Sequence, residues 1–237
     1  MNMLEVRSLR VRYGAFEAVR GVDFELRKGE MLGIVGESGS GKSTIAKVLM
    51  NLQKPSGGEI IRRAKGMQMV FQDAVGSLNP RMTVRQTLSE ALRHAAKSEG
   101  GVAVGGKGAA GLLEIVGLPV SALDQYPREM SGGQCQRVSV ARALASSPEV
   151  LIADEPVSAL DVSVQARVLN LLRDLKDGMG LSILLIAHDL AVVKNVCDRV
   201  CVMERGVFVD AGDAADVFES PQSGYTKKLL SAVPRIV

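Results

Sequence analysis

The sequence GESGSGKST occupies residues 36–44 and fits the pattern G-x-x-x-x-G-K-[ST]. An apolar run of strand length, MLGIV at residues 31–35, precedes it, and the segment IAKVLM at residues 45–50 follows with helical character. Glycines at such a strand-to-helix turn let successive backbone N–H groups converge on a polyphosphate, and the positive end of the helix dipole adds attraction. The stretch therefore predicts an α/β fold built around a phosphate-binding loop.

The residues of this loop have separate predicted tasks. Lys42 is expected to supply a point charge to the β- and γ-phosphates of a nucleotide, and Ser43 a hydroxyl ligand to Mg²⁺. A chance match in a glycine- and serine-rich turn is the alternative, which the strand–helix context disfavours. The loop as a whole comprises Gly36, Glu37, Ser38, Gly39, Ser40, Gly41, Lys42, Ser43 and Thr44.

Composition places the chain among ordinary globular proteins, because 46% of its 237 residues are hydrophobic and 23% are charged. The net charge of +3 is spread along the chain, so nothing indicates a nucleic-acid partner. No secretory signal and no apolar run of the ~18–20 residues of a membrane span is visible. Cys135, Cys197 and Cys201 lack framework spacing, which favours free thiols in a reducing cytoplasm over disulfides or a metal pair.

Before the loop, residues 4–6, 11–13 and 22–26 read as short strands of a small, half-exposed β unit. Tyr13 ends one of them and is either an edge-strand aromatic or a stacking face for a purine. After the loop, a strand at residues 67–71 ends at Gln72, whose amide can reach a neighbouring site.

A mostly helical segment is expected at residues 74–147. Thr83 and Gln86 form a predicted capping box at the start of an amphipathic helix, on which His94 has a structural role. Residues 98–111 hold six glycines in SEGGVAVGGKGAAG and predict a mobile loop or a frayed helix end, because each glycine costs about 1 kcal/mol in a helix.

The sequence SGGQ, made up of Ser131, Gly132, Gly133 and Gln134, opens the next predicted helix. The spacing of its serine and glutamine is that of a capping box, which is one interpretation. Two glycines in a first helical turn favour a second one, because they leave bare N–H groups at a positive helix end. We therefore expect a second phosphate site there.

Two buried strands end in polar residues. VLIA at residues 150–153 runs into Asp154 and Glu155, and ligands of α/β sheets lie at such strand ends. Asp154 is expected at Mg²⁺ and Glu155 at the attacking water; the alternative is an acidic pair that caps the next turn. The strand at residues 181–187 ends at His188, which we expect to hydrogen-bond a γ-phosphate rather than to have a purely structural role.

The order of these elements, together with SALD at residues 158–161, closely resembles the nucleotide-binding subunit of ABC transporters across essentially the whole chain. The resemblance implies a P-loop NTPase fold with a RecA-like core in a single domain, residues 1–237. It further implies an antiparallel β subdomain at about residues 1–30 and 56–70 and an inserted helical subdomain at about 74–147. The resemblance also implies a role for each motif. Residues 36–44 would be the Walker A loop and residues 131–134 the signature motif, Tyr13 would stack on the adenine, and Gln72 would be the Q-loop glutamine that contacts Mg²⁺ or water. Asp154 would be the Walker B aspartate, Glu155 the catalytic base, Asp161 the D-loop aspartate and His188 the switch histidine.

Finer similarity narrows the family. MQMVFQDAVGSLNP at residues 67–80, EPVSALDVSVQA at 155–166 and GYTKKLLSAVP at 224–234 look like ATPases of dipeptide, oligopeptide and nickel importers. Cys135 departs from that family, which carries a polar or basic residue there, and the glycine-rich run is looser than the helix that the family implies.

That resemblance implies ATP and Mg²⁺ as cofactors and a head-to-tail dimer with a second ABC ATPase subunit, identical or paralogous. Transmembrane permease subunits and, indirectly, an extracytoplasmic solute-binding protein are the other implied partners. The implied location is peripheral, on the cytoplasmic face of the inner (plasma) membrane. A soluble ABC ATPase without a membrane partner is the alternative, and a small-molecule kinase would leave SGGQ and His188 unexplained.

Overall fold

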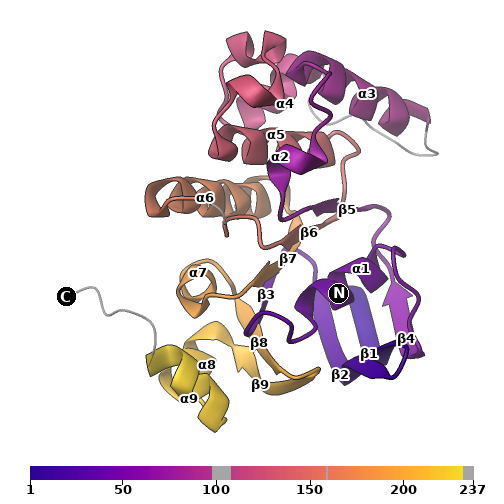
Figure 1. The fold of residues 1–237 in the computed structure, drawn as a ribbon, viewed down its shortest axis with the longest axis vertical. Helices are drawn as coiled ribbons and strands as arrows, with labels where there is room; N and C mark the ends of the chain where they lie inside the picture. The colour runs from indigo at the N-terminus through magenta and orange to yellow at the C-terminus, as the bar shows by residue number, and fades with distance from the viewer. Residues whose placement is uncertain (98–107, 159, 232–237) are drawn as a thin grey trace. The chain divides into compact units, whose positions relative to one another are not determined.

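The computed structural model describes residues 1–97, 108–158 and 160–231 (Figure 1). Three stretches named in the sequence lie wholly or partly outside these residues: 98–107 of the glycine-rich run, Ala159 of SALD, and 232–234 at the end of GYTKKLLSAVP. The chain divides into two units, Met1–Ala64 with Arg173–Val237, and Lys65–Leu172. Each unit is described by itself.

The first unit contains an antiparallel sheet of three strands in the order β2-β1-β4, with β1 at Asn2–Tyr13, β2 at Phe16–Arg27 and β4 at Gly57–Arg62. Residues 4–6 and 11–13 are in strand, as predicted, but they belong to a single strand, because β1 runs through both. A register shift between Val6 and Leu9, where Ser8 adopts a positive φ of 46°, absorbs the break in alternation. Such a bulge keeps the ladder continuous while the apolar side chains stay on one face.

A second sheet of this unit carries the strands β7 (Ser182–Ala187), β3 (Met31–Val35), β8 (Arg199–Glu204) and β9 (Val207–Asp213), in that order. β3 is parallel to β7 and β8, and β9 returns antiparallel to β8. Every residue of β3 and β7 is buried, which explains why both strands read as unbroken apolar runs. The phosphate loop leaves the carboxyl end of β3.

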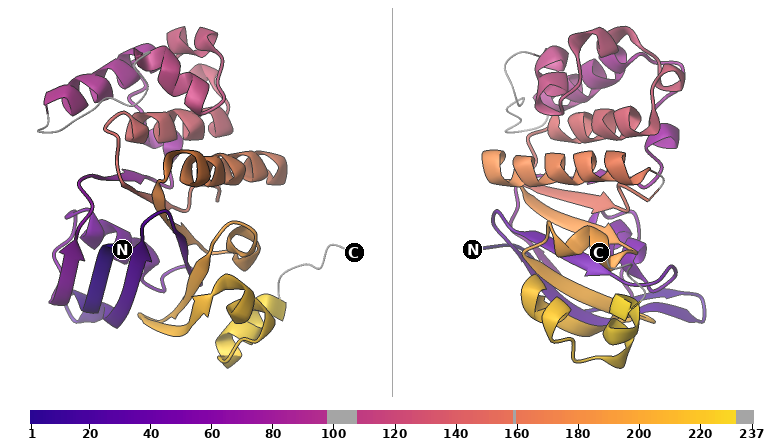
Figure 2. Two further views of the ribbon diagram at one scale, coloured as in Figure 1. Left: turned by 180° about the vertical axis from the view of Figure 1, so that it is seen from behind. Right: turned by 90° about the vertical axis from the view of Figure 1, so that its left-hand side faces the viewer.

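The described residues of the first unit also form the helices α1 (Lys42–Leu49), α7 (Leu190–Lys194), α8 (Ala214–Glu219) and α9 (Gly224–Ser231). α7 contacts β7 and β3, whereas α8 and α9 lie against β9, as both views of Figure 2 show. α9 thus packs on the same sheet from which the phosphate loop extends.

The second unit pairs β5 (Met67–Val70) in parallel with β6 (Val150–Asp154). Between these strands the chain forms α2 (Ala74–Ser77), α3 (Val84–Lys97), α4 (Gly108–Ile115), the 3₁₀ turns η1 (Val120–Asp124) and η2 (Pro127–Glu129), and α5 (Gly132–Leu144). α6 (Val162–Met179) begins here and runs into the first unit. α3, α4 and α5 pack around fully buried Leu88, Leu112 and Leu113.

Two local sequence predictions in this unit, the capping box before α3 and the glycine-rich run, can be compared with the structure. The Thr83 N–H donates to Gln86 Oε1 (2.9 Å) and the Gln86 N–H to Thr83 Oγ1 (3.3 Å), which confirms the predicted capping box before α3. Of the glycine-rich run, residues 108–111 are the first turn of α4, because Ala109 and Ala110 have the highest helix propensity. Among the described residues, we find no helix with the length and apolar character that a membrane crossing requires.

Candidate functional site

The phosphate loop folds around its own lysine. Lys42 is 3% exposed, and its Nζ donates to the carbonyl oxygens of Gly36 (2.7 Å) and Glu37 (2.8 Å) and to Ser40 Oγ (3.4 Å). An ammonium group is a compact charge with three donors, so it can draw several loop oxygens together. The loop therefore has a defined conformation, with the positive charge at its centre.

Gly41 shows why this loop needs glycine immediately before its lysine. Its φ of 113° lies in the left-handed region, at the N-terminal cap of α1. A Cβ at this position would also stand 2.4 Å from the carbonyl oxygen of Ala18 on β2. Conformation and space both exclude a side chain, so this position of the loop requires glycine.

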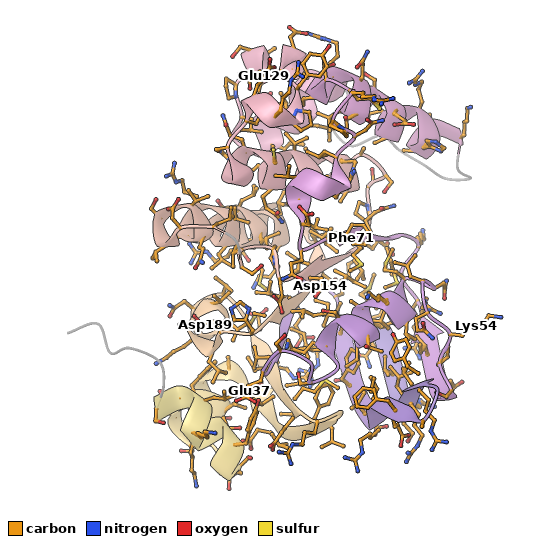
Figure 3. All side chains as sticks on the ribbon, viewed as in Figure 1. Glu37, Lys54, Phe71, Glu129, Asp154 and Asp189 are labelled. Atoms are coloured by element: carbon orange, nitrogen blue, oxygen red, sulfur yellow. The ribbon has the colours of Figure 1, made fainter. Side chains whose placement is uncertain are left out.

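Asp154 and Glu155 come at the end of β6, as predicted, and Figure 3 labels Asp154 there. Asp154 is 6% exposed, so its carboxylate is held inside the protein. Glu155 follows with a positive φ of 46°, which ends the strand. Such a conformation costs roughly 1–2 kcal/mol for a residue other than glycine, and it is concentrated at functional positions.

Gln72 and Glu155 are brought into direct contact. The Gln72 Nε2 donates to Glu155 Oε2 at 2.9 Å and to Ser158 Oγ at 3.4 Å, and the Ser158 hydroxyl donates to the carbonyl of Glu155 at 3.2 Å. These bonds orient the Glu155 carboxylate through the segment that follows β5. The sequence indicated that the Gln72 amide reaches a neighbouring site, but it did not single out Ser158.

The SGGQ segment forms the predicted capping box at the start of α5. The Ser131 N–H donates to Gln134 Oε1 at 2.8 Å, and the Gln134 N–H to Ser131 Oγ at 3.3 Å. The first of the two interpretations of this motif is therefore confirmed as a local structure. Because a capping box uses only two of the orphan N–H groups of a helix end, it is compatible with an anion site there.

Gly133 has a packing function that sequence reasoning missed. A Cβ on this residue would stand 2.3 Å from Cγ1 of Val164 on α6, and one on Gly132 would stand 3.3 Å from Leu160. The close approach of α5 and α6 thus explains why residue 133 is glycine, without reference to an anion. This contact joins residues 31 positions apart, so no local pattern could have indicated it.

The remaining predicted residues lie as follows. Tyr13 ends β1 with 43% of its surface exposed, and exposed His188 immediately follows β7. Asp161 accepts from the Ser163 hydroxyl (2.8 Å) and the Val164 N–H (3.0 Å). These two hydrogen bonds hold the pKa of this exposed carboxyl below its ordinary value, and the bond from Ser163 has the larger effect. Asp161 therefore shapes the start of α6.

The three cysteines are free and buried, as the sequence indicated. Cys135 Sγ lies 3.5 Å from the carbonyl oxygen of Pro127, and burial raises the pKa of its thiol. Burial also raises the pKa of Cys201 to about 12. A thiol with a raised pKa carries little reactive thiolate, so Cys135 acts as a small apolar side chain next to SGGQ.

The donors expected at Mg²⁺ are a hydroxyl (Ser43), an amide oxygen (Gln72) and a carboxylate (Asp154). These are the hard oxygen ligands that Mg²⁺ prefers, and the ion is ordinarily completed by phosphate oxygens and water. Within residues 1–97, 108–158 and 160–231, no cluster of three His, Cys, Asp or Glu side chains could hold a metal by itself. By donor chemistry, the three predicted residues fit Mg²⁺.

Comparison with known sequences gives a family. A sequence model described as "ABC transporter" matches residues 19–158. The oligopeptide transport ATP-binding protein OppF of Lactococcus lactis is 45% identical, with 99% of this chain and 81% of the relative aligned. Its namesakes from Haemophilus influenzae and Salmonella typhimurium are 46% and 44% identical, over 92% and 98% of this chain and 70% and 78% of theirs.

Comparison with solved structures agrees. The ATP-binding cassette MJ0796, a dimer in a post-hydrolysis state with ADP and Pi, superposes with a TM-score of 0.76 at 28% identity, over 90% of this chain and 99% of that one. The cbiO1 cassette of Clostridium perfringens gives 0.79 at 27% identity, over 99% and 97%. The predicted α/β P-loop NTPase fold with an antiparallel β sheet is thereby confirmed, and the chain belongs to the ABC transporter family as an ATP-binding cassette that hydrolyses ATP.

Proposed function

We propose that this chain powers the import of a small solute, an oligopeptide in the first instance, through a membrane permease. The OppF relatives named above support the peptide class. The dipeptide and nickel importers share the motifs noted in the sequence, so a nickel or metal chelate is the second solute class. The hydrogen bond between Gln72 and Glu155 is the structural observation that carries the coupling.

The proposal assigns ATP to the phosphate loop, residues 36–44, with Tyr13 stacked on the adenine. Two subunits act head to tail, so that each ATP lies between the Lys42 of one chain and the partner subunit's Ser131. The second subunit is another copy or a paralogue. The domain organisation that we propose is one cassette of residues 1–237, with a β subdomain (about 1–30 and 56–70) and a helical subdomain (about 74–147).

Hydrolysis needs a base, an orienting group and charge neutralisation. Glu155 takes the proton of the attacking water, and the Gln72 amide, bonded to Glu155 Oε2, keeps the carboxylate in one orientation. His188 hydrogen-bonds the γ-phosphate, and Asp161 shapes the neighbouring turn. Ser43, Asp154 and Gln72 would hold Mg²⁺, which neutralises charge on the phosphate oxygens.

A groove in the second unit supports permease docking. It has a volume of about 730 Å³ and lies among β5, α2, α3 and α5. Phe71, labelled in Figure 3, contributes an aromatic surface that is 41% exposed, and Ala91 and Met69 add further apolar lining. His94, predicted as purely structural, also lines it.

The position of this groove is what links it to catalysis. Phe71 immediately precedes Gln72, which is bonded to Glu155. A permease segment seated beside Phe71 therefore touches the residue next to the one that orients the base. Differential binding of ATP and ADP at the site supplies the free energy that such a link can transmit. On this proposal the chain is peripheral to the membrane, at its cytoplasmic face.

Ala91→Glu tests the docking. The larger, charged side chain enters the groove from the middle of α3, beside its apolar lining, so we expect loss of co-purification with the permease and of peptide-stimulated ATP hydrolysis, while basal hydrolysis in solution persists. Val120→Glu is the matched control, because it adds the same charge on exposed surface of the same unit, outside the groove. Retained permease binding in Ala91→Glu would place the docking surface elsewhere.

A further inference from the structure

The phosphate loop is tied to the C-terminal helix by one hydrogen bond. The main-chain N–H of Glu37, the second residue of the loop, donates to the phenolic oxygen of Tyr225 at 3.0 Å. Tyr225 is the second residue of α9 and stands 188 positions along the chain. Glu37, labelled in Figure 3, thus has its amide held by a side chain of a different element.

α9 is itself fixed to the sheet by Asp210 of β9. One carboxylate oxygen of Asp210 accepts from the Gln222 N–H at 3.3 Å, and the other from the Ser223 N–H at 3.0 Å and from the Thr226 hydroxyl. Thr226 is 0% exposed, so water does not compete for that hydroxyl. Three bonds to one carboxylate therefore hold the start of α9 in place.

Asp210, which holds α9, and Val35, which precedes the phosphate loop, are in register across the sheet. Val35, the last residue of β3, lies opposite Val202 of β8, and Val202 lies opposite Asp210. Two strand spacings of about 4.8 Å therefore separate the anchoring carboxylate from the strand end that opens the loop. We call the connection from the Glu37 amide through Tyr225 and α9 to Asp210 the tether. Because it starts and ends at paired strands of one sheet, it resists displacement of the loop.

The surroundings of Tyr225 keep its hydroxyl in the neutral form. Burial raises the pKa of this phenol above its ordinary value, the Glu37 N–H lowers it, and the carboxylates of Glu37 and Glu204 raise it further. A neutral phenol accepts the amide hydrogen and retains its own proton for another acceptor.

We propose that Tyr225 is a positioning residue for the phosphate loop, whose hydroxyl holds the Glu37 amide and so pre-organises the loop for the nucleotide. The inference rests on the proposed binding of ATP at this loop. A loop held before the ligand arrives loses less conformational freedom on binding. The tether therefore acts on nucleotide affinity and leaves the chemical step unchanged.

Tyr225→Phe is the direct test, since it removes the acceptor oxygen and keeps the ring. We expect the KM and Kd of ATP to rise about two- to tenfold, the effect of one lost hydrogen bond, with kcat unchanged. Amide exchange at Glu37, followed by NMR without nucleotide, should quicken by a similar factor. Tyr126→Phe is the matched control in the second unit and should change neither quantity.

Asp210→Ala is a second test of the tether, because it removes the carboxylate that holds α9 without altering Tyr225. It should reproduce the faster Glu37 exchange and the weaker ATP binding. Unchanged KM or unchanged Glu37 exchange in folded Tyr225→Phe would overturn the inference. Failure of the proposed function looks different: wild-type protein and Lys42→Ala would bind ATP equally well, while the exchange at Glu37 would still report the tether.

Discussion

Replacing Glu155 by glutamine should lower the rate of ATP hydrolysis by about 10²–10⁴-fold, the usual contribution of a general base. Glutamine has the size of glutamate, and its carbonyl oxygen can still accept from Gln72, but it cannot take up the proton of the attacking water. Nucleotide binding should persist, so ATP-bound dimers accumulate. Phosphate release measures the first effect, and size-exclusion chromatography with ATP measures the second.

Glu90→Gln is the control for this variant, because Glu90 is an exposed carboxylate on α3 of the same unit. It should hydrolyse ATP at the wild-type rate. Normal turnover in Glu155→Gln would show that another group is the base, and the strained backbone of Glu155 would then need a different explanation.

Lys42→Ala should weaken nucleotide binding tenfold or more, on the order of 1.5–3 kcal/mol for a charged hydrogen bond. The structure adds a second reason for a large effect, since Lys42 Nζ also holds the carbonyl oxygens of Gly36 and Glu37. Removal of the ammonium takes away the phosphate charge and the group around which the loop closes. Titration calorimetry with ATP measures the change.

Lys47→Ala is the matched control for Lys42→Ala. Lys47 lies on the same helix, α1, but is exposed to solvent. Its removal changes the net charge by the same amount without touching the loop, so ATP affinity should be nearly unchanged. Equal ATP affinity of wild-type protein and a folded Lys42→Ala variant would contradict the assignment of the loop.

The sequence predicted best those features that short patterns encode. The strand, loop and helix around Lys42 follow from an apolar run, glycines and a helical segment that are adjacent in the chain. The two capping boxes follow from residues three positions apart, Thr83 with Gln86 and Ser131 with Gln134. Local hydrogen bonding alone determines such features, so they needed no knowledge of the tertiary structure.

Features that depend on distant residues were not predictable. The continuity of β1 depends on pairing with β2 and β4 across the bulge at Ser8. Gly133 is required by Val164 of another helix, and Tyr225 reaches Glu37 across most of the chain. The bond from Gln72 to Glu155 likewise depends on the parallel pairing of β5 and β6, which places their ends side by side.

In the function that we propose, ATP hydrolysis by this chain drives solute import. The most direct test of this function is uptake of a labelled oligopeptide into proteoliposomes that hold the chain, its permease and its solute-binding protein. We predict uptake that requires Mg-ATP and that falls to the level of vesicles without permease when Glu155→Gln replaces the wild-type chain. Peptide uptake that proceeds equally well with Glu155→Gln, or that does not respond to ATP with the wild-type chain, would contradict the account.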